Sequence, residues 1–94
     1  MSNIIFIVLI TMYFLYILKC SDDSLYTGIT TDIEKRLKMH SWEIPWGAKY
    51  TRARLPVELV YSEKVWDRSE ATKRELQVKK LSREKKMKLI QEDV

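Results

Sequence analysis

The hydrophobic positions in the first half of the chain predict a β-hairpin followed by a helix. Two runs rich in aromatic and β-branched residues, 13–20 and 25–30, flank a short polar turn at 21–24. This is the pattern of two paired antiparallel strands. Thr31 and Glu34 then form a Ser/Thr-x-x-Glu capping box, which predicts that a helix begins at this point.

The length of the hairpin loop decides whether Tyr16 and Tyr26 share a face of the sheet. Side chains alternate along a strand, so the parity of the loop controls this relation. A two-residue loop would place the two phenols on opposite faces. A three-residue loop, Asp22 to Ser24, would pair Cys20 with Tyr26 and place both phenols on one face. Such a loop needs a left-handed residue, which Asp tolerates better than most, so we predict the three-residue loop.

The helix predicted after the hairpin carries two candidate site residues on its apolar side. Ile33 and Leu37 are four residues apart and define that side. At 100° per residue, His40 lies about 20° from Ile33 and Arg36 about 60° from it. An arginine and the only histidine of the chain are therefore expected to face the hairpin.

The second half of the chain predicts one more strand and two more helices. Pro56 opens an alternation that places Leu59 and Tyr61 on one face of a strand. Asp67 is expected to cap a second helix and Ser82 a third. The resulting order, β-β-α-β-α-α, predicts an α/β domain with a small three-stranded, mainly antiparallel sheet flanked by helices.

Glu75 stands in the middle of an apolar stripe on the second of these helices. Ala71, Glu75 and Val78 fall within about 60° of one another around the helix axis. A carboxylate in this position needs a partner, because burying it bare is strongly unfavourable. The partner can be a metal ion, or a cation such as Arg36 in a structural ion pair, and the sequence leaves both open.

Composition indicates a single domain with a basic bias. The chain has 94 residues, with 17 Lys and Arg against 13 Asp and Glu, a net charge of +4 and a pI near 9.2. A basic bias suits a polyanionic partner such as DNA. The single Cys20 excludes an internal disulfide, no set of zinc ligands is evident, and a cytoplasmic setting is expected.

Residues 4–18 are apolar apart from Thr11. A membrane span needs about 20 such residues, and a signal peptide needs a basic start and a small-residue cleavage site. The end of the run is also needed as the first strand of the hairpin. We therefore predict an apolar extension over residues 1–12, a folded domain over residues 13–91 and no membrane association. A membrane-anchored protein is the alternative.

Residues 47–54, Gly-Ala-Lys-Tyr-Thr-Arg-Ala-Arg, combine three cations with a tyrosine. This mixture can hold a phosphate backbone and stack on an unpaired base, although it also suits a solvated linker. Gly28 suits either a close approach of the backbone to a substrate or a strand bulge. The predicted contacts with nucleic acid are Gly28, Lys49, Tyr50, Arg52 and Arg54.

Together these motifs resemble the GIY-YIG nuclease family, and in particular its small stand-alone bacterial members of the UPF0213 type. The resemblance runs from about residue 13 to residue 90. Phe14 stands where the family name has glycine, and no asparagine follows Glu75. The matching segments are Phe14-Leu15-Tyr16, Tyr26-Thr27-Gly28, the helix with Arg36 and His40, Gly47 to Arg52, Pro56 to Tyr61, and Arg74-Glu75.

The resemblance implies a DNA endonuclease that hydrolyses phosphodiester bonds with one divalent metal ion, Mg²⁺ or Mn²⁺, and acts on structured DNA in repair or processing. Glu75 would ligate the metal, and Tyr16 would help to activate the attacking water. Arg36 and Tyr26 would stabilise the charge on the phosphate, and His40 would support Tyr16. No small-molecule cofactor is expected, and a monomer is favoured. The alternative is a non-catalytic nucleic-acid-binding module of the same fold.

Overall fold

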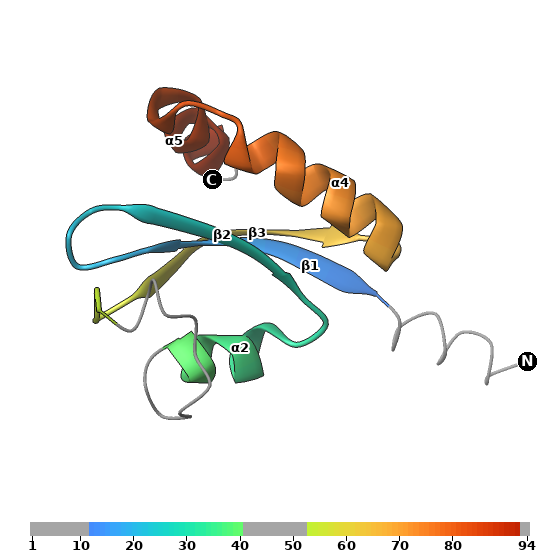
Figure 1. Cartoon of the computed structure of the whole chain (residues 1–94), viewed down its shortest axis with the longest axis horizontal. Coiled ribbons are helices and arrows are strands. Elements are labelled where there is room, and N and C mark those ends of the chain that lie inside the picture. Colours follow the sequence, from blue (N-terminus) through green and yellow to red (C-terminus); the bar gives the residue numbers. More distant parts are fainter. Residues whose placement is uncertain (1–11, 41–52, 93–94) are drawn as a thin grey trace, which may run out of the picture.

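The chain folds into a three-stranded antiparallel sheet with helices on both faces, and the computed structural model describes residues 12–40 and 53–92 (Figure 1). The strands lie in the order β2-β1-β3. The predicted sheet and the predicted β-β-α-β-α-α order are both confirmed. The elements are β1 (Tyr13–Lys19), β2 (Leu25–Thr30), α2 (Ile33–His40), β3 (Glu58–Val65), α4 (Arg68–Lys79) and α5 (Arg83–Glu92).

The β1–β2 hairpin closes with a three-residue loop over residues 21–23. The N–H of Cys20 donates to the carbonyl of Ser24 at 2.9 Å, and the N–H of Asp23 donates to the carbonyl of Cys20 at 3.0 Å. Asp23 has a φ of 65°, the left-handed conformation that a loop of this length requires. The predicted loop length is therefore correct, but the loop begins one residue earlier than predicted.

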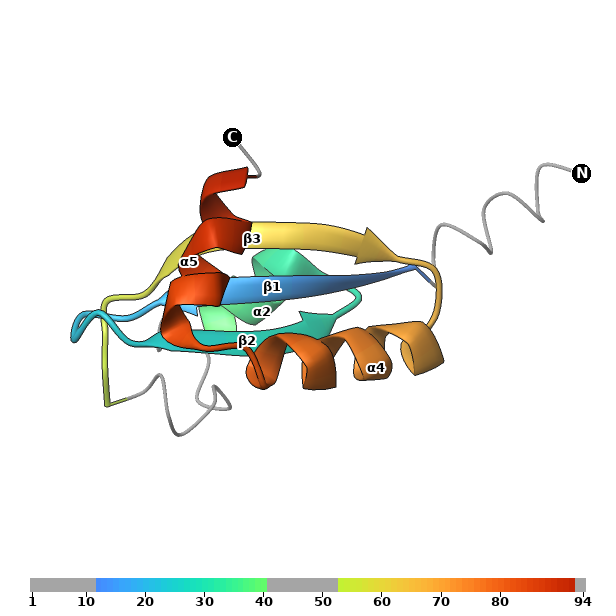
Figure 2. The same cartoon turned by 90° about the horizontal axis from the view of Figure 1, so that it is seen from above.

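The central strand β1 is buried on both faces of the sheet. Leu15 and Ile17 are fully buried and pack with Val78 of α4. Tyr16 and Leu18, which alternate with them, are also buried and point to the opposite face. Figures 1 and 2 show α4 and α5 on one face and α2 on the other, so each face of β1 is covered by a different helical layer.

The helices α4 and α5 begin where the sequence predicts. The Asp67 side chain accepts a hydrogen bond from the N–H of Glu70 at 2.9 Å, which caps α4. The Ser82 hydroxyl accepts from the N–H of Lys85 at 3.2 Å, which caps α5. These hydrogen bonds confirm both predicted caps. The caps could be predicted because each depends on a local sequence pattern.

A bulge in β3 changes which of its side chains face α4. Ile17 of β1 pairs with Tyr61, but the next residue, Leu18, pairs with Leu59, so β3 has one extra residue between them. Leu59 and Tyr61 therefore lie on opposite faces, and the predicted alternation is wrong at this point. The bulge places Tyr61, and Glu63 two residues later, on the face covered by α4.

No helix within the described parts of the chain has the length and apolar character needed to cross a bilayer. Residues 13–18, the end of the apolar run, belong to β1 and are hydrogen-bonded within the sheet. Residues 1–11, which make up most of the predicted extension, lie outside the described residues.

Leu15→Ala should lower the free energy of unfolding by about 2–5 kcal/mol, because it leaves a cavity at a fully buried position. Leu76→Ala, at a leucine that is 54% exposed on α4, is the matched control and should change it by less than about 0.5 kcal/mol. Urea unfolding followed by circular dichroism measures both. Similar losses in the two variants would contradict this assignment of the core.

Candidate active site

The register of the hairpin brings Tyr16 and Tyr26 onto one face of the sheet. Tyr16 lies opposite Gly28, and Leu18 lies opposite Tyr26. The predicted pairing of Cys20 with Tyr26 is wrong, because moving the loop by one residue moves the register by two. The loop still has an odd number of residues, so the phenols share a face as predicted. Their ring centroids are 6.3 Å apart, with the planes inclined by 37°.

Gly28 makes room for the ring of Tyr16. A Cβ atom at Gly28 would lie 2.6 Å from Cζ of Tyr16 and 3.1 Å from its Cε1, closer than non-bonded carbon atoms approach. The φ angle of Gly28 is not positive, so the position needs glycine for space and not for backbone conformation. The close approach at this glycine is that of the Tyr16 ring, and its contact with nucleic acid stays a prediction.

Three predicted site residues act on the phenol of Tyr16. Burial raises the pKa of Tyr16 above its usual value of 10.0, Tyr26 and Glu75 raise this pKa further, and Arg36 lowers it. The three residues come from β2, α4 and α2, so three different elements contribute to the electrostatic environment of the Tyr16 hydroxyl. The phenol is consequently protonated at neutral pH.

Arg36 reaches the site from the beginning of α2. Asp32 caps this helix, since its side chain accepts from the N–H of Lys35 and its carbonyl from the N–H of Arg36, both at 3.1 Å. The capping residue is therefore Asp32 and not Thr31, which the sequence predicted. Arg36 is half-buried and, together with Lys35, lines a hollow of about 260 Å³ between the end of β2 and α2. A guanidinium in such a place suits a phosphate group.

Glu75 occupies a half-buried flank of α4. Its side chain is 20% exposed, and its carboxylate forms an ion pair with Lys79 at 3.3 Å. Ala71 and Val78, on either side of it along the helix, are fully buried. The ion-pair partner of the Glu75 carboxylate is thus a lysine of the same helix and not Arg36. The i,i+4 spacing of Glu75 and Lys79 is the sequence signal that would have predicted this pair.

The residues of the site suit a metal ion with few protein ligands. Within residues 12–40 and 53–92, no three His, Cys, Asp or Glu side chains gather closely enough to hold a metal by themselves. Mg²⁺ commonly binds one or two carboxylates and keeps water or phosphate oxygens as its other ligands. The partly exposed carboxylate of Glu75, whose charge raises the pKa of Tyr16, fits the part of a single protein ligand.

Arg54 is held at the hairpin turn. Its Nε forms an ion pair with Oδ2 of Asp22 at 3.0 Å, and its carbonyl accepts from the N–H of Ser21 at 2.9 Å. A contact of Arg54 with nucleic acid stays a prediction, as does the role of His40, the last residue of α2, whose side chain is outside the described part. Three further predicted contacts lie outside the described residues: Lys49, Tyr50 and Arg52.

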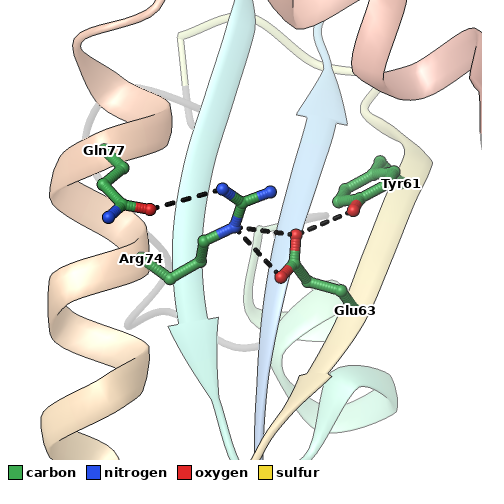
Figure 3. A network of polar contacts seen from close by, with 4 residues as sticks. All are labelled: Tyr61, Glu63, Arg74 and Gln77. Atoms are coloured by element: carbon green, nitrogen blue, oxygen red, sulfur yellow. Dashed lines mark hydrogen bonds and ion pairs between the residues drawn. The ribbon is translucent and has the colours of Figure 1, made fainter.

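A polar network on α4 was not predicted from the sequence. Figure 3 shows Arg74 reaching from α4 across the sheet to Glu63 on β3, with its Nε 3.2 and 3.1 Å from the two carboxylate oxygens. Tyr61 donates to the same carboxylate at 2.7 Å, and Nη1 of Arg74 donates to Gln77 at 3.4 Å. This network joins α4 to β3, which are brought together only by the fold, and it depends on the bulge in β3. No local sequence pattern predicts it.

Comparison with known proteins decides the family. A model of the GIY-YIG catalytic domain matches residues 12–88. The chain belongs to the GIY-YIG family. Membership in this family indicates nuclease chemistry, and it confirms the resemblance that the tyrosine-containing tripeptides suggested.

Relatives of this GIY-YIG protein include two UPF0213 proteins of high similarity. One, from Staphylococcus saprophyticus, is 54% identical over 80 residues, which cover 85% of this chain and 95% of the relative. Another, from Clostridium perfringens, is 53% identical over 79 residues, which cover 84% of this chain and 83% of the relative.

Two solution NMR structures share the fold of this GIY-YIG protein. The UPF0213 protein of Bacillus halodurans is 45% identical with a TM-score of 0.55, and a protein of E. faecalis is 43% identical with a TM-score of 0.60. Each comparison covers 85% of this chain and 83% of the other.

Gly28→Ala should destabilise this GIY-YIG protein by about 1–3 kcal/mol, because the new methyl group overlaps the Tyr16 ring. Tyr16→Leu removes the overlapping atoms, so the cost of Gly28→Ala should largely disappear when both changes are combined. Thermal or urea unfolding of the two single variants and the double variant measures the coupling. An equal cost of Gly28→Ala with and without the ring would show that the glycine serves another purpose.

Stability should decline at alkaline pH because two tyrosines resist ionisation in the folded state. The pKa of Tyr16 lies above 10.0, mainly through burial, and burial with the hydrogen bond to Glu63 raises the pKa of Tyr61 to about 12. The folded state therefore holds these protons more tightly than the unfolded state. The stability that the two protonated phenols contribute to the folded state is fully present below a pH of about 10, and it is lost progressively above that pH.

Urea unfolding between a pH of about 9 and a pH of about 12 tests this dependence. Tyr16→Phe and Tyr61→Phe should each flatten the decline, because phenylalanine has no proton to lose. A decline of unchanged steepness in both variants would assign the alkaline loss to other groups.

Proposed function

We propose that this protein is a divalent-metal-dependent DNA endonuclease that hydrolyses phosphodiester bonds and acts on structured DNA in repair or processing. The observation that carries the proposal is that the Tyr26 ring lies 6.3 Å from the ring of Tyr16, and that the charges of Arg36 on α2 and Glu75 on α4 both act on the pKa of the Tyr16 phenol. Membership in the GIY-YIG family supports nuclease chemistry. The net charge of +4 supports a polyanionic substrate.

In the proposed reaction a water oxygen attacks the phosphorus atom, and the bond from phosphorus to one bridging oxygen breaks. The water loses a proton, and the leaving oxygen is finally protonated. The transition state places extra negative charge on the phosphate oxygens, so fixed cations and donors nearby lower the barrier. Arg36 would bind these oxygens through its guanidinium, and the Tyr26 hydroxyl would donate to them.

Glu75 would hold Mg²⁺ or Mn²⁺. When bound, the ion supplies a Lewis acid for a phosphate oxygen and lowers the pKa of a coordinated water. Lys79 forms an ion pair with the same carboxylate, so its ammonium group competes with a metal ion for Glu75. Lys79 would therefore move away from the carboxylate when a metal ion binds.

Tyr16 would orient the attacking water. Burial holds the pKa of Tyr16 above its usual value, so the hydroxyl stays protonated at neutral pH and acts through its hydrogen bonds. Arg36 lowers this pKa, and a cation at Glu75 would act in the same direction. The phenol would thus become a better proton acceptor as the site fills. By resemblance to the family, His40 would support Tyr16 by a hydrogen bond.

A second candidate function is a nucleic-acid-binding module of the same fold that performs no hydrolysis. The observation that favours it is the ion pair between Glu75 and Lys79, because it satisfies the half-buried carboxylate without a metal ion. The two candidates differ in what Glu75 does, and substitution of Glu75 separates them.

Glu75→Gln should abolish cleavage of duplex, flap or junction DNA in Mg²⁺ or Mn²⁺, with a loss of at least about 100-fold, because it removes the charge that holds the metal. Its size is conserved, so the fold should persist. Glu70→Gln is the matched control, since Glu70 is an exposed carboxylate on the same helix that also has a lysine partner. It should cleave like the wild type.

Arg36→Ala completes this test. It should also abolish cleavage but leave Mn²⁺ binding intact, because its proposed partner is the phosphate, whereas Lys38→Ala on the exposed side of α2 should have little effect. The assay needs thermal melts of every variant. DNA binding without cleavage by the wild type on all substrates would leave the non-catalytic module as the better account.

A further inference from the structure

Arg74, Glu63 and Tyr61 form a clamp that ties α4 to β3, and we use the name clamp for these three residues. The guanidinium and the carboxylate are each only partly exposed, at 34% and 25%. In Figure 3 the Arg74 side chain extends from α4 over β2, and the Glu63 side chain extends from β3 over β1 to meet it, so a helix beside one edge strand is connected to the opposite edge strand.

The clamp and the proposed metal ligand occupy opposite flanks of the same helix. Ala71 and Val78 are fully buried and mark the line along which α4 rests on the sheet. At 100° per residue, Arg74 lies about 50° to one side of that line and Glu75 about 50° to the other. Because Arg74 points inward to β3, Glu75 must point outward, towards the edge formed by β2. The rise in the pKa of Tyr16 caused by Glu75 agrees with this direction.

The buried line alone fixes the roll of α4 about its axis only weakly. It consists of one methyl group and one valine, and most other side chains of the helix are exposed. A roll of about 10° moves an atom about 5–6 Å from the helix axis by about 1 Å. A displacement of about 1 Å in a catalytic group can cost about 100-fold in rate.

We propose that the clamp of Arg74, Glu63 and Tyr61 sets the roll of α4 and thereby directs Glu75 to the β2 edge of the sheet, where the Tyr16 ring lies against Gly28. The inference deepens the proposed function and rests on it to the extent that Glu75 is a metal ligand. Arg74 acts here as a positioning residue, because it faces away from the phosphate-binding side and acts through the helix.

The chemistry of the clamp suits a fixed geometry. The Nε–H of Arg74 is shared between both carboxylate oxygens, while Nη1 is held by Gln77 on the same helix. Tyr61 approaches the carboxylate from β3 itself and donates at 2.7 Å. Each end of the ion pair is therefore fixed by a second hydrogen bond, which limits the rotamers that would let α4 roll.

Cleavage as a function of Mn²⁺ concentration tests the clamp. Arg74→Met and Glu63→Gln should raise the Mn²⁺ concentration for half-maximal rate at least about 10-fold, at a temperature at which each variant is fully folded. Arg74→Lys keeps the charge and should fall between Arg74→Met and the wild type. Lys73→Met is the matched control, because Lys73 forms an ion pair on the same helix but with exposed Glu70. It should leave the Mn²⁺ dependence unchanged.

A purely structural clamp would lower the melting temperature without changing the Mn²⁺ dependence of the folded variants, and this result would overturn the proposal. If Arg74→Met does not fold, Tyr61→Phe removes a single hydrogen bond and should still shift the Mn²⁺ dependence in the same direction. A normal Mn²⁺ dependence in folded Tyr61→Phe and Glu63→Gln would also overturn it.

A measurement without cleavage separates this inference from the proposed function. The ring proton signals of Tyr16 in NMR spectra report on the carboxylate placed near that ring. Arg74→Met should shift these signals in the wild-type background and leave them nearly unchanged when Glu75 is already glutamine. If the wild type neither cleaves DNA nor binds Mn²⁺, the proposed function fails, but this coupling still decides whether the clamp positions Glu75. Equal shifts in the two backgrounds would contradict the proposal that the clamp positions Glu75.

Discussion

The register between β1 and β2 is the constraint on which the rest of the structure depends. It is set at the loop, where Asp23 takes a left-handed conformation and the strands close at Cys20 and Ser24. This closure puts Tyr16 opposite Gly28, the one position of β2 without a side chain. A shift by one residue would turn every side chain of β2 to the other face and place the phenol of Tyr26 among the residues of the core. Fold and site are thus specified by the same few backbone hydrogen bonds.

Local patterns predicted much of the fold because they act over a few residues. The caps at Asp67 and Ser82 and the odd parity of the hairpin loop could be predicted in this way. The features that were missed depend on contacts between elements. The bulge beside Leu59, for example, lets Tyr61 turn towards α4 and pack against the core. The pattern of apolar residues in β3 contains no sign of that turn.

The candidate site also contains features that local patterns predicted and features that depend on contacts between side chains. Periodicity places Arg36 on the side of α2 that faces the hairpin, and Glu75 on the buried side of α4, and the charges of both side chains act on the pKa of Tyr16. Their surroundings could not be predicted as well. Lys79 accompanies Glu75, and the pair of Arg74 with Glu63 joins residues on two elements. Sequence therefore predicted the positions of Arg36 and Glu75 in the fold better than the ion pairs that surround them.

Because β1 is buried on both faces of the sheet, mutant phenotypes at its positions are difficult to interpret. Leu15 and Ile17 face the core, and the alternating residues Tyr16 and Leu18 are also buried, so substitutions at any of these four positions are expected to affect folding. Substitutions at Tyr16 or Gly28 disturb packing, so a loss of function in such an allele would not by itself demonstrate a chemical role for either residue. Arg36 and Glu75 are on helices at the periphery and are only half-buried. Alleles at these two helical positions would therefore separate the proposed chemistry from folding more cleanly.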